Sequence, residues 1–490
     1  MSTTNVTVEI AEWIEKVRFD DIPRRITEEA KNQVLSMIAA VHAGYFSEVG
    51  RAIRRAAKDW NPGKEATIIP AGERVAIGDA LFANCALAQA LDYDDHLFAA
   101  HTGASAVLVT LALAEKIGFS GKEFLTAQIV ANEIEGRLGA ALLDCGQQSQ
   151  SLAVGHLVGS AVIAAKIMGF ERDKIASTLG LALAFPNASL EPAYFGSDAK
   201  ALVAAASVAN GVRAAQLVAS GVVGPIDVLE NPRGLLASFT HHPFHNAFSG
   251  LGTIWLTETL CYKPYPGCAA IDGALDCVLD LVRQHSIDSK KVKGVQVSTV
   301  PYVLETDNLI RPYLKGPDTL PSTLNFSVRY SVAAALVDRE LSARQFTAER
   351  VRDPATWDLA ERVVLSLDPA MTERARSAAL VRNPGGSEGE RVLELDQMRL
   401  NQYRPAVGAK VRIELHDGRS FEAEQEIPQG AAGKMFDDRR KVVQDKFRRE
   451  TRYTLKKEKM EKAIDAILHI DQSNAAGLRE LVRLCCSERN

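Results

Sequence analysis

Apolar residues recur at helical spacing along the first half of the chain, from about residue 6 to residue 260, and strand-like alternation is scarce there. Turn signals such as Asn61-Pro62-Gly63 separate the apolar segments. Two segments, 160–168 and 199–223, are rich in alanine, and small side chains let helix backbones approach closely. The pattern predicts an array of helices with these two segments in its packed centre.

The pattern changes at the sequence KPYPG, residues 263–267, where two prolines and a glycine interrupt the helical spacing. Strand-like runs follow at 292–301 and 362–367. A later run, 410–426, alternates on both sides of an Asp-Gly turn, which predicts a hairpin. With a helix predicted at 325–337, these elements indicate a separate α+β unit over 263–431.

After residue 431 the chain is charged and helical again, up to its end. These last helices can return to the first half, which would make the α+β unit an insertion, or they can form a tail. The predicted fold class is mainly α in either case. The predicted segments are 1–262, a helical part, 263–431, the α+β part, and 432–490, a second helical part.

The composition narrows the function classes. The chain has 490 residues, with 57 basic and 61 acidic side chains and a formal net charge of −4. This balance argues against nucleic acid as a partner, and leaves small molecules or proteins. The apolar stretches 104–113 and 151–170 are the nearest to membrane spans, but the first is short and the second contains His156 and Lys166. We expect both to be buried helices.

Seven cysteines are scattered along the chain without a CxxC pair, which fits a reducing compartment and makes a metal or disulfide framework improbable. The N-terminal residues carry early acidic groups and no apolar core segment of a signal peptide. We expect a cytoplasmic protein.

The segment ALAQALDYDDHLFAAHTGASA, residues 86–106, carries the candidate chemistry. Asp92 and His96 are four residues apart and could share a helix face, and His101 follows in a loop. A carboxylate beside an imidazole orients the ring and suits it to acid–base catalysis at neutral pH. The alternative is an acidic helix end with no catalytic role.

Several motifs, in order along the chain, resemble the MmgE/PrpD family, which includes 2-methylcitrate dehydratase, cis-aconitate decarboxylase and iminodisuccinate epimerase. They are LDYDD (91–95), HTGAS (101–105), ANEIEGRLGAALL (131–143), IAAKIMGF (163–170), GSDAKALVAAASVANG (196–211), KPYPG (263–267) and NFSVRYSVAAAL (325–336). The resemblance implies a helical domain made from both ends of the chain, an inserted α+β lid and an active site in the cleft between them. It also implies a homodimer and catalysis without a metal or other cofactor.

The resemblance also implies the roles of individual residues. Asp92, His101, Lys200 and Tyr330 match catalytic positions of the family's motifs. His96, which replaces a threonine found in decarboxylase-like members, Gln150 and Lys263 are expected to bind the carboxylate substrate. A lysine on an alanine-rich helix is costly to bury without an anionic partner, which independently favours a function for Lys200.

Two departures from the family pattern bear on the reaction. A family histidine falls on Gln150, and the loop PGCAAID after KPYP, residues 266–272, has no counterpart of another. Histidines 241, 242 and 245 are expected on a surface turn instead. Dehydration needs both a base and an acid for the departing hydroxide, whereas epimerisation and decarboxylation need fewer groups. We expect a hydro-lyase acting on a small di- or tricarboxylate, with an isomerase, a decarboxylase or an inactive binding protein as alternatives.

Overall fold

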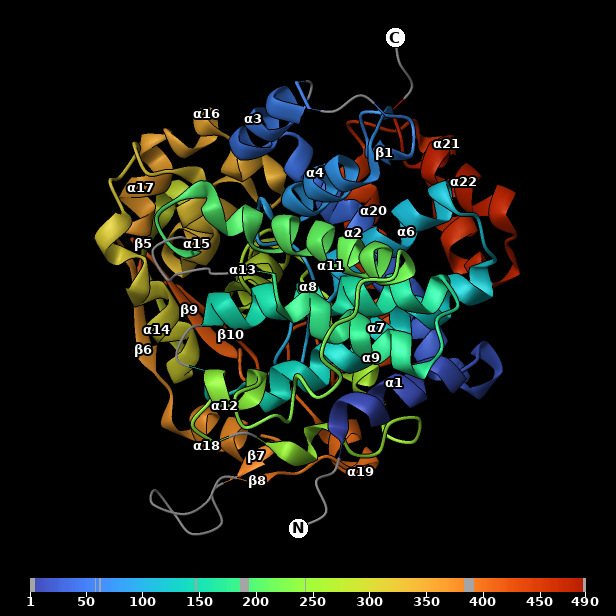
Figure 1. Cartoon of the computed structure of the whole chain (residues 1–490). Helices are drawn as coiled ribbons and strands as arrows, with labels where there is room; N and C mark the ends of the chain where they lie inside the picture. The colour runs from blue at the N-terminus through green and yellow to red at the C-terminus, as the bar shows by residue number, and fades with distance from the viewer. Residues whose placement is uncertain are drawn as a thin grey trace.

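A long helical body and a smaller sheet-containing unit make up the molecule in this computed structural model (Figure 1). The structure describes residues 5–57, 59–60, 63–145, 148–185, 194–242, 244–382 and 392–487, without the side chains of 148–150, 245 and 382. The helices of the first half are α1 (Val6–Lys16), α2 (Arg24–Tyr45), α3 (Glu48–Ala57), α4 (Ile77–Gln89), α5 (Gly103–Ala106), α6 (Leu108–Lys116), α7 (Gly121–Ala141), α8 (Gln148–Ile167), α9 (Arg172–Leu183), α11 (Val203–Ala219) and α12 (Leu235–Phe239).

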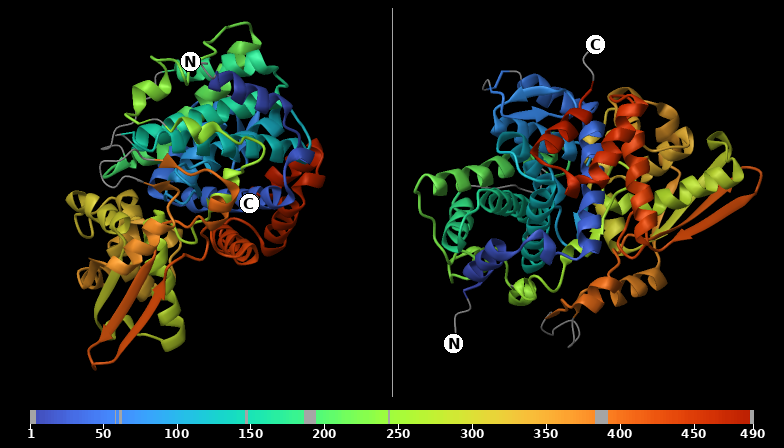
Figure 2. Two further views of the ribbon diagram at one scale, coloured as in Figure 1. Left: turned by 90° about the horizontal axis from the view of Figure 1, so that it is seen from below. Right: turned by 90° about the vertical axis from the view of Figure 1, so that its right-hand side faces the viewer.

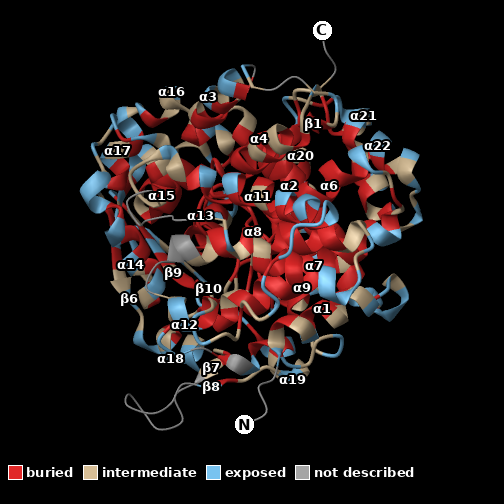
Figure 3. Ribbon diagram, viewed as in Figure 1, coloured by how far each residue is buried: buried red, intermediate tan, exposed pale blue. Residues whose placement is uncertain are grey.

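Helices α8 and α11 pack against each other in the buried interior of the body (Figure 3). Their small side chains allow this, since a Cβ on Gly211 would lie only 2.0 Å from Ser160 Oγ. The expectation that the alanine-rich segments form the packed centre is confirmed. The described segment Asp198–Ala219 is long and apolar enough to cross a membrane, but 67% of its apolar window is buried inside the protein. It therefore has the environment of a core helix.

The smaller unit is built on a four-stranded sheet of order β10-β9-β5-β6. The strands are β5 (Val292–Thr299), β6 (Val363–Leu367), β9 (Ala409–Leu415) and β10 (Ser420–Gln425). Strand β9 is antiparallel to β5 and β10, and β6 runs parallel to β5. The predicted hairpin is present, and Gly418 adopts a positive φ of 88° in its turn. The apolar faces of these alternating strands are covered by helices (Figure 2).

The sheet unit projects from one side of the helical body (Figure 2). The helices of this unit are α13 (Asp272–His285), α14 (Pro301–Leu309), α15 (Val328–Asp338), α16 (Ala348–Val351), α17 (Pro354–Ala360) and α18 (Pro369–Ser377), whereas α19 (Gln397–Gln402) lies against residues 256–259 of the helical body. Helix α13 packs on β9 and β10, and α15 packs on α13, α17 and β6. Two-stranded pairs occur elsewhere: β1 (Ala66–Ile68) with β2 (Glu73–Val75), β3 (His96–Leu97) with β4 (Leu260–Cys261), and β7 (Val381–Arg382) with β8 (Val392–Leu393).

The end of the chain returns to its beginning. Helices α20 (Phe436–Thr451) and α21 (Lys457–Leu468) pack against α2, and α22 (Ala475–Leu484) packs against α6 (Figure 1). Buried polar contacts fix this return: Arg439 pairs with Glu29 of α2, and Lys446 Nζ donates to Tyr93 O at 2.8 Å. The sheet unit is consequently flanked in sequence by two parts of one helical body.

Candidate active site

The chain reverses direction just after α4, and this reversal aims three carboxylates inward. Helix α4 ends at Gln89, and Asp92 then adopts the left-handed region with φ of 46°. Asp92, Asp94 and Asp95 are all buried. The expectation that Asp92 and His96 share a helix face is wrong, because the helix has already ended and His96 begins strand β3. Asp92 and His96 nevertheless line the same cavity.

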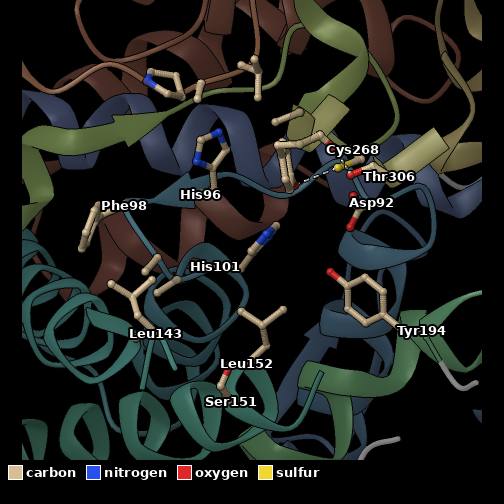
Figure 4. A pocket seen from close by; sticks show the side chains of 18 of the residues that line it. Asp92, His96, Phe98, His101, Leu143, Ser151, Leu152, Tyr194, Cys268 and Thr306 are labelled. Atoms are coloured by element: carbon tan, nitrogen blue, oxygen red, sulfur yellow. Dashed lines mark hydrogen bonds between the residues drawn. The ribbon is translucent and has the colours of Figure 1, made fainter. Parts of the chain in front are cut away.

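This cavity has a volume of about 420 Å³ and lies between the helical body and the sheet unit (Figure 4). Its polar lining residues include Asp92, His96, His101, Lys263, Cys268, Tyr302 and Thr306. Four residues proposed from the sequence, Asp92, His96, His101 and Lys263, are therefore brought together. Tyr194 and Thr306 come from elements distant in the sequence and complete one side of the wall (Figure 4).

Asp92 is held between two buried lysines. Lys200 Nζ lies 2.8 Å from Asp92 Oδ1, and Lys263 Nζ lies 3.2 Å from Oδ2 and also donates to the Asp92 carbonyl. Burial alone would raise the pKa of Asp92, but the two ammonium groups outweigh it and hold that pKa below its usual value. Asp92 in turn keeps the pKa of both lysines raised despite their burial. Lys200 stands behind Asp92 and is not a lining residue of the cavity.

His101 is oriented by Asp94, the second acid of the LDYDD motif, for which the sequence predicts no role of its own. The imidazole Nδ1 lies 3.1 Å from Asp94 Oδ2. His101 and Lys263 hold the pKa of Asp94 well below its usual range, against the effect of burial. An ionised carboxylate accepts a hydrogen bond, so Nδ1 carries a proton. Nε2 is then the ring nitrogen available to a molecule in the cavity, either to accept or to return a proton.

His96 differs from His101 although their ring centres are only 6.3 Å apart. Desolvation, together with the nearby His101 and Lys263, lowers the pKa of His96 to about 3. The ring is therefore neutral at physiological pH. It can accept or donate a hydrogen bond to a substrate, but it does not supply positive charge.

A second polar layer supports Asp94 from behind. The Gln89 side chain accepts a hydrogen bond from Ala204 N at 3.0 Å, which fixes its amide orientation. Its Nε2 donates to Asp94 Oδ2 at 3.2 Å and lies 3.5 Å from His156 Nε2. His156 Nδ1 lies 3.0 Å from Ser105 Oγ. Burial lowers the pKa of His156 to about 3, so this ring is a neutral part of the support.

Asp95 ties the His101 loop to the helical body. Its Oδ1 accepts hydrogen bonds from Gly103 N at 3.1 Å and from Gln33 Nε2 at 3.2 Å. A Cβ on Gly103 would lie 2.4 Å from Asp95 Oδ2, so this close approach requires glycine. The HTG sequence and the last acid of LDYDD thus form one local structure.

Tyr330 requires a correction. It does not line the cavity: its hydroxyl donates to Gln345 O at 2.6 Å, and its ring packs against Phe346 and Trp357. The reason is its position on α15, which turns this side chain toward α17 in the core of the sheet unit. The expectation that Tyr330 faces the same crevice as Asp92 and His101 is wrong. The Gln150 side chain lies outside the described residues.

The cavity also contains residues that the sequence did not reveal. Cys268 Sγ lies 3.6 Å from the hydroxyl of Tyr302, and Thr306 follows one turn later on α14. These residues carry no local motif, and only their packing brings them to the wall. Within the described part of the chain, no group of three or more His, Cys, Asp or Glu residues is placed to hold a metal ion.

Comparisons with known proteins place the chain in a family. The MmgE/PrpD N-terminal domain matches residues 8–246 and the MmgE/PrpD C-terminal domain matches residues 265–471. A cis-aconitate decarboxylase from Aspergillus terreus is 25% identical over 96% of this chain and 94% of its own length. A cis-aconitate decarboxylase from Homo sapiens is 23% identical over 75% of this chain and 78% of its own length. The chain is therefore a member of the MmgE/PrpD family of enzymes.

Proposed function

We propose that this enzyme is a lyase that releases CO₂ from a small carboxylic acid, by proton transfer at a carbon next to a carboxylate. The observation that carries the proposal is the His101–Asp94 pair, in which a carboxylate orients an imidazole that lines the cavity together with Lys263. Similarity to two proteins named cis-aconitate decarboxylase, over 96% and 75% of this chain, supports it.

The reaction needs few groups. Cleavage of the carbon–carbon bond releases CO₂ and leaves the electron pair on the substrate carbon, delocalised onto the neighbouring carboxylate. Lys263 lines the same cavity and can stabilise this negative charge, although its ammonium group is shared with Asp92 and Asp94. Protonated His101 then transfers its Nε2 proton to that carbon, and solvent restores the proton. The net change is loss of CO₂ and gain of one proton. A general acid of this kind typically accelerates the reaction by about 10²–10⁴-fold.

Dehydration, expected first from the sequence, demands a second acid for the departing hydroxide. His96 is a second histidine in the cavity wall, and burial together with His101 lowers its pKa to about 3, so the ring is neutral at physiological pH. The geometry thus supports a one-histidine reaction better. Dehydration and epimerisation of a similar acid are the alternatives that the assay must separate.

The test is proton NMR in D₂O of the full-length enzyme with cis-aconitate, 2-methylcitrate, iminodisuccinate and a panel of related acids. Release of CO₂ with incorporation of one deuteron supports the proposal. Loss of water without release of CO₂ would identify a dehydratase instead. Deuterium exchange without cleavage of a carbon bond would identify an epimerase. The His101→Gln variant is expected to lose activity, whereas His242→Gln, on the exposed side chain paired with Asp144, is the matched control.

We further propose that the enzyme works in the cytoplasm as a homodimer without a cofactor, as the family resemblance implies. Light scattering during size-exclusion chromatography should give twice the 53.1 kDa chain mass. Activity should survive dialysis against a chelator. A monomer mass would contradict the homodimer, and loss of activity after treatment with the chelator would contradict catalysis without a metal.

A further inference from the structure

The two ends of the active-site cavity differ in chemistry. Asp92, Tyr194, Cys268 and Thr306 stand at one end, and Phe98 and Leu143 stand at the other (Figure 4). His96 and His101 lie between the two groups (Figure 4). At the apolar end the ring of Tyr403 packs against that of Phe98, with 5.6 Å between the ring centres, whereas Leu152 lies beside His101 in the middle of the cavity (Figure 4). A substrate that reacts beside His101 therefore meets a polar wall on one side and an apolar wall on the other.

The positive charges at the polar end are already paired with carboxylates of the protein. Lys263 lies against Asp92 and Asp94, and Lys200 lies against Asp92, so the two lysines are balanced by two carboxylates. Glu305, an exposed residue of α14, adds a negative charge at the wall. Among the described lining residues, the remaining source of positive charge is His101 in its protonated form.

The segments next to Ser151 and Tyr194 in the sequence add no basic side chain. Ser151 and Tyr194 line the cavity, and the adjoining segments 146–150 and 186–193 read GQQSQ and PNASLEPA. Neither segment contains Lys, Arg or His. A third carboxylate directed at the apolar end would lose its hydration against Leu142 and Leu143, and the described wall gives it no counter-charge.

We propose that the substrate is a dicarboxylate with an apolar substituent, in place of the third carboxylate of a tricarboxylic acid. One carboxylate stays at the polar end, where the hydroxyls of Tyr194 and Tyr302 can donate hydrogen bonds to it without free positive charge. The carboxylate to be lost lies beside His101, and the substituent occupies the space lined by Phe98 and Leu143. The inference rests on the proposed function for the fate of the second carboxylate, while the binding preference is measurable without turnover.

The probes share one carbon skeleton, on which the central substituent varies. Calorimetric titration of the full-length protein compares propane-1,2,3-tricarboxylate with 3-methylglutarate and 3-propylglutarate. We expect 3-methylglutarate to bind at least about tenfold more tightly than the tricarboxylate, since an unpaired carboxylate would be desolvated. Each added methylene should tighten binding about threefold, as apolar surface is buried. Tighter binding of the tricarboxylate would overturn the inference.

A charge placed at the apolar end should reverse the preference. Leu143→Lys is expected to tighten binding of the tricarboxylate about tenfold and to weaken 3-propylglutarate by a similar factor. Leu217→Lys, on the 39%-exposed side chain of α11, is the matched control and should leave all affinities unchanged. If Leu143→Lys lowers the melting temperature, Leu143→Asn provides a milder change at the same position, for which weaker binding of 3-propylglutarate is expected. Unchanged affinities in both folded variants would contradict the inference.

The same titrations separate this inference from the proposed function. Preferential binding of the alkyl acids without CO₂ release from any acid of this class would leave the inference standing and remove the decarboxylase proposal. If a tricarboxylate binds most tightly and is efficiently decarboxylated, the decarboxylase proposal stands and the inference about the apolar substituent is removed.

Discussion

Gln89 donates its amide hydrogen to Asp94 Oδ2 at 3.2 Å, and that same oxygen faces His101 Nδ1 at 3.1 Å. The amide cannot rotate freely, because Gln89 Oε1 accepts from Ala204 N. Asp94 is therefore held on its helical side by α4 and α11, while its contacts on the cavity side are the His101 imidazole and Lys263 Nζ, which lies 3.7 Å from Oδ1. This makes Gln89 a positioning residue of the proposed reaction.

Replacement of Gln89 by leucine is expected to lower kcat about 10–100-fold with little change in KM. The substrate keeps its direct contacts, but Asp94 and His101 lose their fixed geometry. The acidic limb of the pH–rate profile should move as well, because the environment of the Asp94–His101 pair changes. Gln216→Leu, an exposed position on α11, is the control. An unchanged pH profile with normal kcat would show that Asp94 needs no such support.

Replacement of Lys200 by methionine is expected to destabilise the fold by about 3–5 kcal/mol, since Asp92 remains buried after losing one of its two cationic partners. Urea denaturation followed by circular dichroism measures this change. The double variant Lys200→Met with Asp92→Asn should recover part of the loss, because it removes the uncompensated carboxylate. Additive losses in the double variant would contradict the pairing.

The Tyr330→Phe variant tests the corrected role of this tyrosine. Removal of the hydroxyl leaves Gln345 O without its hydrogen-bond donor, which should cost about 1–3 kcal/mol of stability. Activity, measured as kcat/KM of the residual folded enzyme, should stay within about threefold of the wild type, as Tyr330 does not line the cavity. A loss of activity of about a hundredfold or more at unchanged stability would restore a catalytic role for Tyr330.

Acid should destabilise the protein through buried His42. Burial lowers the pKa of His42 from 6.5 to about 3, and its Nδ1 lies 2.6 Å from Thr454 Oγ1 near the end of α20. Between pH 6.5 and pH 3, His42 therefore binds a proton in the unfolded chain but not in the folded chain. The stability contribution is fully present above pH 6.5 and decreases as the pH falls toward 3, by about 1.4 kcal/mol per pH unit for one proton.

Urea midpoints measured between pH 7 and pH 4 check this expectation. His42→Gln should lower stability at pH 7 and flatten the pH dependence by one proton. His469→Gln removes a histidine whose side chain is 56% exposed, and should leave the slope as it is. Equal slopes for wild type and His42→Gln would contradict the assignment of His42.

Local patterns in the sequence were sufficient for much of the architecture. The 3.6-residue spacing of apolar positions corresponds to the helices of the first half. The break at KPYPG corresponds to the start of the sheet unit, and the Asp-Gly turn near residue 417 corresponds to the β9–β10 hairpin. These features depend on preferences of neighbouring residues, so they can be inferred without the tertiary structure. The same holds for the LDYDD and HTGAS motifs, which indicated the family.

The tertiary structure alone decided which side chains meet. Lys263 reaches Asp92 across 171 residues of sequence, and Tyr302 meets Cys268 from another helix of the sheet unit. Tyr330 lies in a family-like motif, yet the packing of α15 against α17 turns it away from the cavity. The physical reason is that such meetings depend on long-range packing of whole helices, which a local hydrophobic pattern does not encode. The sequence therefore determined the elements and the types of chemical group, and the packing decided their partners and protonation states.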